Sequence, residues 1–200
     1  MLKKILKILA YITGSILAII LILFAILLIK SPGKTDPITD EEGNVLPKSI
    51  AKIETIEVGG IDQYIITRAA DSTKPVILFI HGGPGSPETA FMRKENQFLE
   101  NDFVMVYWEQ RGAGKTYTPE TPPESMTIDQ FILDTKEVSE YLIKKYKKEK
   151  IYILGHSWGS FLGILTAYKH PDLYHAYFGT GQVGYQYEGE KVSFEWVKNQ

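Results

Sequence analysis

Residues 151–162, with the sequence IYILGHSWGSFL, place a serine between an apolar run and a helical pattern. The first four residues predict a buried strand, and apolar residues at helical spacing follow the serine. Ser157 is flanked two residues away on each side by Gly155 and Gly159. In a sharp strand-to-helix turn, such glycines remove side chains that would clash, and the serine hydroxyl stands exposed above the sheet. The sequence therefore predicts that Ser157 is a nucleophile.

The helix expected after Ser157 adds an electrostatic contribution. The N-terminus of a helix offers backbone N–H groups without intrahelical partners and the positive end of the helix dipole. We expect the N–H of Trp158, the residue after the nucleophile, to donate to an oxyanion formed on a substrate. The alternative is a serine in a glycine-flanked turn without a catalytic role.

A second glycine-rich motif, His81-Gly82-Gly83-Pro84-Gly85, follows the apolar run at residues 76–80. That run predicts a strand beside the strand that leads to Ser157, and glycines let a backbone approach a substrate closely. We expect the N–H of Gly83 to be the second oxyanion donor; the alternative is a turn that needs positive φ. His81 is not expected to be the general base, because in this kind of site the base comes late in the chain.

The order of strands and helices predicts a mostly parallel α/β sheet that begins with an antiparallel hairpin at Gly59-Gly60. Ligands of such sheets bind at the carboxyl ends of the strands, where the glycine-rich motifs fall. A long helix is expected to begin at the N-cap Thr127 and run for about 20 residues. The remaining elements are expected as strands at residues 53–58, 61–68, 76–80, 103–107, 151–154 and 174–179, a helix at roughly 89–99, and a helix that follows Ser157 and stops near His170-Pro171.

A third motif, Glu109-Gln110-Arg111-Gly112-x-Gly114, follows the strand at 103–107. Taken together in this order and spacing, the three motifs resemble those of prolyl iminopeptidase-like α/β-hydrolases. The resemblance covers residues 53–183, with Glu109 where the family typically has aspartate. It implies Ser157 as nucleophile and Gly83 and Trp158 as oxyanion donors. The supporting motif positions are His81, Gly82, Gly85, Gly155, Gly159, Glu109 and Arg111.

The resemblance also implies an activity. The family releases N-terminal residues, often proline, from short peptides, and it needs no metal or organic cofactor. We therefore expect an aminopeptidase acting on short peptides or on other small esters and amides, with no nucleic-acid partner. In the complete fold a lid, two more strands and the triad acid and base would follow, so residues 184–200 are expected to begin the lid.

On this expectation the chain is an N-terminal portion that stops before the triad is complete. A serine without its base is a weak nucleophile, so the 200-residue chain alone is expected to be nearly inactive. Two alternatives are a non-catalytic binding protein and a split enzyme completed by another chain. His156, His170 and His175 are expected to be structural, and Asp134 and Asp172 to be surface acids.

The N-terminus carries an uncharged apolar run at residues 8–29. As a helix it would be about 33 Å long, enough to span the roughly 30 Å core of a bilayer. Lys3, Lys4 and Lys7 precede it, and Lys30 and Lys34 follow it. This balance predicts a cytoplasmic N-terminus, which would leave the catalytic domain outside the cytoplasm. The alternatives are a cleaved signal peptide and a buried helix. The expected organisation is an anchor at 1–30, a linker at 31–50, the N-terminal part of the hydrolase domain at 51–183 and the lid entry at 184–200.

Composition restricts the remaining possibilities. The formal net charge is −2 and cysteine is absent, which excludes disulfides, cysteine nucleophiles and thiolate zinc sites. Gly114-Lys115-Thr116 resembles the end of a phosphate-binding loop, but Glu109 stands where that motif needs glycine. Five lysines between residues 144 and 150 are expected to form a solvated helix end, with contact to an anionic membrane as the alternative.

Overall fold

The computed structural model describes residues 2–30 and 33–200. They form two compact units that divide between Thr35 and Asp36. Residues 36–49, which fall within the predicted linker, belong to the second unit. There Thr39 and Val45 form an isolated β-bridge, and Arg68 Nη1 donates to the carbonyl of Asp36 at 2.6 Å.

The described residues of the first unit include the helix α1 (Leu2–Lys30). Its segment Lys3–Ile29 has a mean hydropathy of 3.1, and its side chains are exposed. A helix of this length and composition is long and apolar enough to cross a membrane.

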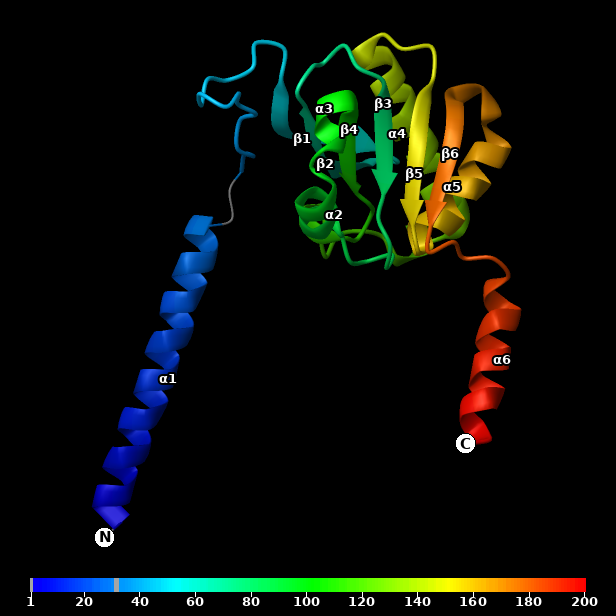
Figure 1. The fold of residues 1–200 in the computed structure, drawn as a ribbon. Helices are drawn as coiled ribbons and strands as arrows, with labels where there is room; N and C mark the ends of the chain where they lie inside the picture. Colours follow the sequence, from blue (N-terminus) through cyan, green and yellow to red (C-terminus); the bar gives the residue numbers. More distant parts are fainter. Residues whose placement is uncertain (1, 31–32) are drawn as a thin grey trace. The chain divides into compact units, whose positions relative to one another are not determined.

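The second unit is a six-stranded sheet in the order β1-β2-β4-β3-β5-β6, seen edge to edge in Figure 1. The β1–β2 and β2–β4 pairs are antiparallel, and β4, β3, β5 and β6 run parallel to one another. The strands are β1 (Ile50–Val58), β2 (Ile61–Ala69), β3 (Val76–Ile80), β4 (Val104–Glu109), β5 (Ile151–His156) and β6 (Tyr174–Thr180). The helices are α2 (Thr89–Asn96), α3 (Leu99–Asp102), α4 (Ile128–Tyr146), α5 (Trp158–Lys169) and α6 (Gln186–Lys198), with short 3₁₀ turns at Gly114–Thr116, Pro123–Ser125 and Pro171–Leu173.

The hairpin at the edge of the sheet turns at Gly59 and Gly60, whose φ angles are 55° and 75°. Two consecutive positive φ angles are the signature of the tight turn whose twist matches that of the strands it joins. Val58 therefore pairs directly with Ile61, and the register continues to Ile50 opposite Ala69.

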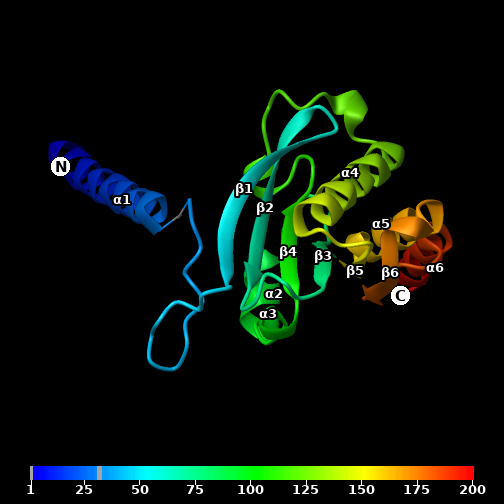
Figure 2. The same ribbon diagram turned by 90° about the horizontal axis from the view of Figure 1, so that it is seen from above.

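The two faces of the sheet are covered by different helices, as Figure 2 shows from above. Alternate residues of the central strands point to opposite faces, so all five residues of β3 and all six of β4 are buried. One face packs against α4 and α5 through Leu78, Val106, Leu142 and Leu162, among others. The other face packs against the α2–α3 segment through Phe79, Met105 and Tyr107, with Met92 and Leu99.

Local sequence signals predicted the start of α4 correctly but did not predict the break between α2 and α3. Thr127 caps α4, because its side chain accepts a hydrogen bond from Gln130 N–H at 3.2 Å. The helix expected at residues 89–99 is instead two helices, α2 and α3. Tighter bonds between residues three apart, from Glu100 N–H to the carbonyl of Gln97, form the turn between them. Glu100 is then buried and its carboxylate pairs with Arg68 Nε at 2.7 Å.

The expectation that Asp134 is a surface acid is wrong. Its side chain is fully buried and accepts two hydrogen bonds from Arg111, at 2.9 Å from Nε and 3.0 Å from Nη2. Gln63 on β2 donates to the same carboxylate at 2.8 Å, and Arg111 Nη2 also reaches the carbonyl of Gly59 at 2.9 Å. Arg111 thus joins the hairpin and the end of β4 to α4, and a buried ion pair must be satisfied in this way to be tolerated.

Removal of the Asp134 carboxylate should strongly destabilise the second unit. We expect Asp134→Ala to lower the free energy of unfolding by about 3–5 kcal/mol, because it leaves the Arg111 charge buried without its partner. The matched control is Glu140→Ala, which removes an exposed pair with Lys136 on the same helix and should cost about 0.5 kcal/mol or less. Urea unfolding followed by tryptophan fluorescence measures both. Similar losses for the two variants would contradict the structural role given to Arg111 and Asp134.

Candidate active site

Ser157 lies between the end of β5 and the start of α5, with φ 52° and ψ −120°. A positive φ in a residue other than glycine costs about 1–3 kcal/mol and persists only where the surroundings hold it. Here Ser157 N–H donates to the carbonyl of Thr180 at 2.9 Å. The carbonyl of Ser157 accepts from Ser160 N–H at 2.9 Å and from Ser160 Oγ at 2.6 Å. These bonds fix the strained turn from both sides.

The two glycines of the motif sit where a side chain has no room. A Cβ on Gly155 would lie 2.3 Å from the carbonyl oxygen of Gly159. A Cβ on Gly159 would lie 2.0 Å from the carbonyl oxygen of Ile80, at the end of β3. Helix α5 therefore starts in backbone-to-backbone contact with the neighbouring strand, which sets its N-terminus directly beneath Ser157.

The loop after β3 approaches Ser157 just as closely. A Cβ on Gly82 would lie 3.1 Å from Ser157 Cβ and 3.4 Å from the carbonyl oxygen of His156. Gly83 has φ 111°, and its peptide bond to Pro84 is cis. The structure thus brings Gly83 and Trp158 to the same pocket as Ser157. Gly85 follows in the exposed part of the loop, with no atom within 4 Å of the position of a Cβ.

His81 is fully buried, and both of its ring nitrogens have partners. Gln110 N–H donates to Nε2 at 3.1 Å, so Nε2 carries no proton and the neutral ring is protonated on Nδ1. Nδ1–H then donates to the carbonyl of Gly82 at 2.7 Å. Burial lowers the pKa of His81, against the raising effects of the Gly82 carbonyl and the Glu88 carboxylate. A neutral ring with both nitrogens occupied is not placed to take a proton from Ser157.

The hydrogen bond from His81 also determines the direction of a donor. In a planar trans peptide the N–H points away from the C=O, so fixing the Gly82 carbonyl fixes the N–H of Gly83. The side chain of Gln110 extends this network: Nε2 donates to the carbonyl of His81 at 2.8 Å, and Oε1 accepts from Trp158 Nε1 at 3.1 Å. One buried amide thereby connects the ends of β3 and β4 with the first residue of α5. Sequence analysis did not single out Gln110, although it lies inside the third motif.

Glu88 is a second residue that sequence analysis missed. Its Oε2 accepts from Gly82 N–H at 3.2 Å and lies 2.7 Å from His156 Nδ1. The carboxylate therefore bridges the loop after β3 and the residue before Ser157. No local sequence pattern predicts this contact, because Glu88 and His156 are 68 residues apart in the chain.

The motif residues Glu109 and Arg111 lie away from Ser157 and have structural contacts. The Glu109 carboxylate accepts from Lys115 N–H and closes the turn at Gly114, while Thr116 Oγ1 donates to the Glu109 carbonyl at 2.6 Å. Arg111 is held by Asp134, as described above. Neither side chain lines the pocket at Ser157. Both residues stabilise the segment that presents Gln110.

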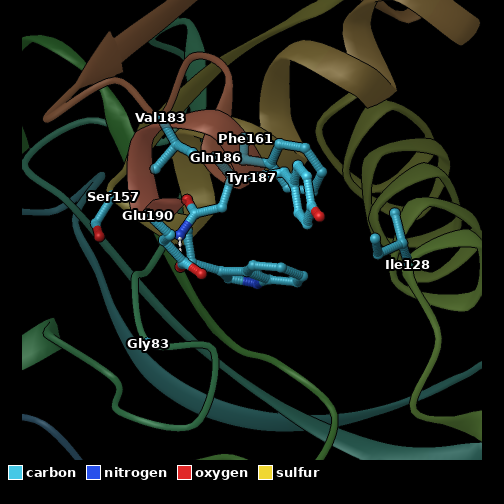
Figure 3. Close-up of a pocket in the computed structure, with 9 residues that line it drawn as sticks. Gly83, Ile128, Ser157, Phe161, Val183, Gln186, Tyr187 and Glu190 are labelled. Carbon is cyan, nitrogen blue, oxygen red and sulfur yellow. Dashed lines mark hydrogen bonds between the residues drawn. The ribbon is translucent and has the colours of Figure 1, made fainter. Parts of the chain in front are cut away.

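A pocket of about 440 Å³ opens at Ser157. In Figure 3 Ser157 stands above the loop that carries Gly83, with Phe161 and Tyr187 between it and Ile128. The lining is mainly apolar and aromatic, which suits a small organic ligand whose reacting group faces Ser157. The lining residues are Gly83, Ile128, Ser157, Trp158, Phe161, Val183, Gln186, Tyr187 and Glu190.

Residues 75–192 match the family model described as alpha/beta hydrolase fold. The chain therefore belongs to the α/β-hydrolase family, and the predicted fold class is confirmed. The family match fits the observed sheet, in which an antiparallel hairpin precedes parallel strands and a strand–serine–helix turn.

The curated relatives are named as an aminopeptidase and as proline iminopeptidases, which confirms the resemblance inferred from the three motifs. The chain is 36% identical over 151 residues to "Probable aminopeptidase YbaC" of Bacillus subtilis (strain 168), covering 76% of this chain and 48% of that protein. It is 27% identical over 106 residues to the proline iminopeptidase of Lactobacillus helveticus (strain DPC 4571), covering 53% of this chain and 35% of that protein. The chain thus spans about half or less of the length of these relatives.

Solved structures share the fold at lower sequence identity. A proline iminopeptidase-related protein from Thermus thermophilus aligns with a TM-score of 0.56 and 24% identity, covering 64% of this chain and 43% of that chain. An epoxide hydrolase from Vigna radiata aligns with a TM-score of 0.55 and 24% identity, covering 67% of this chain and 40% of that chain. These two likenesses establish the fold and say nothing of the substrate.

The contact between α5 and β3 predicts a sharp difference between two glycine substitutions. Gly159→Ala places a methyl group 2.0 Å from a backbone oxygen and should cost about 3 kcal/mol or more, because neither backbone can move freely. Gly85→Ala meets no atom within 4 Å and serves as the control, with an expected change of about 0.5 kcal/mol or less. Thermal or urea unfolding distinguishes them, and equal tolerance of the two changes would contradict the packing.

The buried neutral state of His81 predicts a pH dependence. Because its pKa in the folded protein is lowered from the ordinary 6.5, the unfolded chain binds this proton more readily. The contribution of His81 to stability is therefore complete above about pH 6.5 and is lost progressively as the pH falls below it. Acidification should destabilise the wild type more than His81→Gln, measured as the free energy of unfolding between about pH 7.5 and pH 5. Parallel pH curves for the two proteins would show that His81 is not held neutral.

Proposed function

We propose that Ser157 is the nucleophile of a membrane-anchored serine hydrolase that releases N-terminal residues, proline in particular, from short peptides. The observation that carries the proposal is the geometry of Ser157, held at φ 52° at the N-cap of α5 beside the Gly83 loop. Strained residues of this kind cluster at active sites. The aminopeptidase names of the curated relatives support the substrate class.

The proposed chemistry is acyl transfer. Ser157 Oγ attacks the carbonyl carbon of the N-terminal residue, and the oxyanion that forms accepts hydrogen bonds from the N–H groups of Gly83 and Trp158. The amine of the following residue leaves with a proton, and water then hydrolyses the acyl-enzyme. Loss of one oxyanion donor typically lowers the rate about 10²–10³-fold. The His81–Gln110 network matters because it holds the proposed donors in position.

A base and an acid are needed to activate Ser157. His81 has both nitrogens engaged, and His156 Nδ1 is paired with Glu88. His170 follows the last residue of α5 and His175 is the second residue of β6, so both lie at the ends of these elements away from Ser157. We therefore assign the base and the acid to sequence outside these 200 residues, in agreement with the greater length of the relatives. The pocket wall contributed by α6 is then the beginning of the lid.

The proposal places α1 across the membrane as an uncleaved anchor. Three lysines, Lys3, Lys4 and Lys7, precede its apolar segment, and two, Lys30 and Lys34, follow it closely. By the positive-inside rule, the N-terminus is cytoplasmic and the hydrolase unit lies on the other side.

The function is tested by labelling and turnover in the whole protein. A fluorophosphonate probe should label the wild type and the control Ser193→Ala, which changes an exposed serine of α6, but not Ser157→Ala. Hydrolysis of a proline arylamide should fall about 10⁶-fold in Ser157→Ala. The same arylamide with an acetylated amine should be a poor substrate for the wild type.

Three results would contradict the proposal. Labelling that persists in Ser157→Ala would show that another residue is the nucleophile. Equal hydrolysis of the free and acetylated substrates would exclude an aminopeptidase while leaving a serine hydrolase. Turnover by the 200-residue chain alone at the rate of the whole protein would show that the base and acid lie within it.

A further inference from the structure

The charges of the second unit are unevenly distributed. Residues 36–200 contain all 24 acidic residues of the chain and 17 lysines and arginines, so the unit is negative overall. Six lysines nevertheless gather at one end of its sheet, and we call this group the lysine surface. Its members are Lys48, Lys52, Lys74, Lys145, Lys147 and Lys148.

Three segments far apart in the sequence meet to form the lysine surface. They are the start of β1, the turn before β3 and the end of α4. Ser72 N–H donates to the carbonyl of Lys48 at 2.9 Å, and Lys148 Nζ donates to the carbonyl of Thr73 at 2.6 Å. Figure 1 shows the turns before β3 and β5 at the same end of the sheet, away from the arrowheads that lead to the Ser157 site. The lysine surface is therefore at the opposite end of the sheet from the catalytic edge.

A hollow of about 420 Å³ lies in the middle of the lysine surface. Its walls carry three of the lysines, Lys52, Lys145 and Lys147, together with Ile50, Glu54, Ser72 and Tyr146. The lysines of such a hollow offer ammonium donors to an anionic group, which is the chemistry that a phosphate ester would need.

Three acids lie in or beside this surface and leave a positive excess. Glu54 is shared between Lys52 Nζ, at 2.8 Å, and Lys145 Nζ. Asp71 interacts with Lys48 and Lys74. Glu149 is exposed next to Lys148 in the sequence. Six cations thus face these three carboxylates, in a unit that is otherwise strongly acidic.

We propose that the lysine surface binds the anionic lipid headgroups of a membrane and seats the second unit on the bilayer. An acidic unit near an anionic bilayer is repelled at most orientations and attracted only where its positive end faces the lipid. The chain enters the sheet at Ile50, between Lys48 and Lys52, so the segment that leads from α1 into the sheet passes through the lysine surface itself. A tether at that point keeps the surface at a high local concentration near any membrane that α1 occupies.

The orientation has a functional consequence. Because the Ser157 edge lies at the other end of the strands, a unit seated on its lysine surface presents the pocket to the aqueous phase. Soluble ligands would then reach the pocket without crossing the headgroup layer. The proposal rests on the membrane placement proposed for α1 but does not depend on the chemistry assigned to Ser157.

The absence of cysteine allows single-site labels on the full chain. Glu149→Cys places a fluorophore beside the lysine surface, and Glu120→Cys places one in the exposed loop after β4, near the catalytic edge. Both changes remove one carboxylate, so the labelled chains match in charge. Each is reconstituted in vesicles of phosphatidylcholine, with or without phosphatidylglycerol, that carry a headgroup quencher. We expect the Glu149→Cys label to be quenched strongly when phosphatidylglycerol is present, and the Glu120→Cys label to change little.

Charge variants decide whether the lysines are responsible. Each lysine near an anionic surface favours the bound state about fivefold, so Lys→Gln at positions 48, 52, 74 and 147 together should lower the ratio of seated to unseated chains at least about tenfold. The control neutralises four lysines elsewhere, at positions 94, 169, 191 and 198, and should retain the quenching. About 1 M salt, where the Debye length is about 3 Å, should abolish it.

Quenching at Glu149→Cys that is equal with and without phosphatidylglycerol would overturn the proposal. So would an equal loss in the two sets of lysine variants. Binding of inorganic phosphate to the lysine surface, with no difference in quenching between the two vesicle types, would assign the surface to a soluble anion and equally reject the membrane.

Discussion

The close approach of the start of α5 to the backbone at the ends of β3 and β5 is the constraint on which the rest of the site depends. Gly155 and Gly159 let α5 begin against Ile80, where a single Cβ would overlap a backbone oxygen. Only with the helix in this place can Ser157 hold its positive φ and still bond through its N–H and its carbonyl. The strain of about 1–3 kcal/mol in one residue is offset by packing that is shared among three elements.

Buried hydrogen bonds connect the turn at Ser157 to the neighbouring loop after β3 and fix both in position. A neutral His81 orients the Gly82–Gly83 peptide, and Gln110 connects His81 to Trp158 across three strand ends. On the other side, Glu88 ties the same loop to His156. The two proposed oxyanion donors are thus positioned by different elements but fixed by one connected network. Such preorganisation is what electrostatic stabilisation of a transition state requires.

The sequence predicted the features that rest on local chemistry. Thr127 caps a helix because its own hydroxyl bonds three residues ahead, and the Gly59-Gly60 hairpin follows from backbone freedom. Asp134, Gln110 and Glu88 were misjudged or missed because each has a deciding partner 23 to 71 residues away, where a single sequence carries no signal: Arg111 and Gln63 for Asp134, His81 for Gln110 and His156 for Glu88. The break between α2 and α3 was not predicted for the same reason, since it accompanies the burial of Glu100 against Arg68, 32 residues away.

The central claim is that Ser157 attacks a carbonyl whose oxygen accepts hydrogen bonds from the N–H groups of Gly83 and Trp158. The most direct measurement is a crystal structure of the whole protein inactivated with a peptidyl phosphonate, a stable mimic of the tetrahedral intermediate. The account predicts phosphorus bonded to Ser157 Oγ, with one phosphonate oxygen about 2.7–3.1 Å from the backbone nitrogens of both Gly83 and Trp158. An adduct on another residue, or a phosphonate oxygen directed away from both nitrogens, would contradict it.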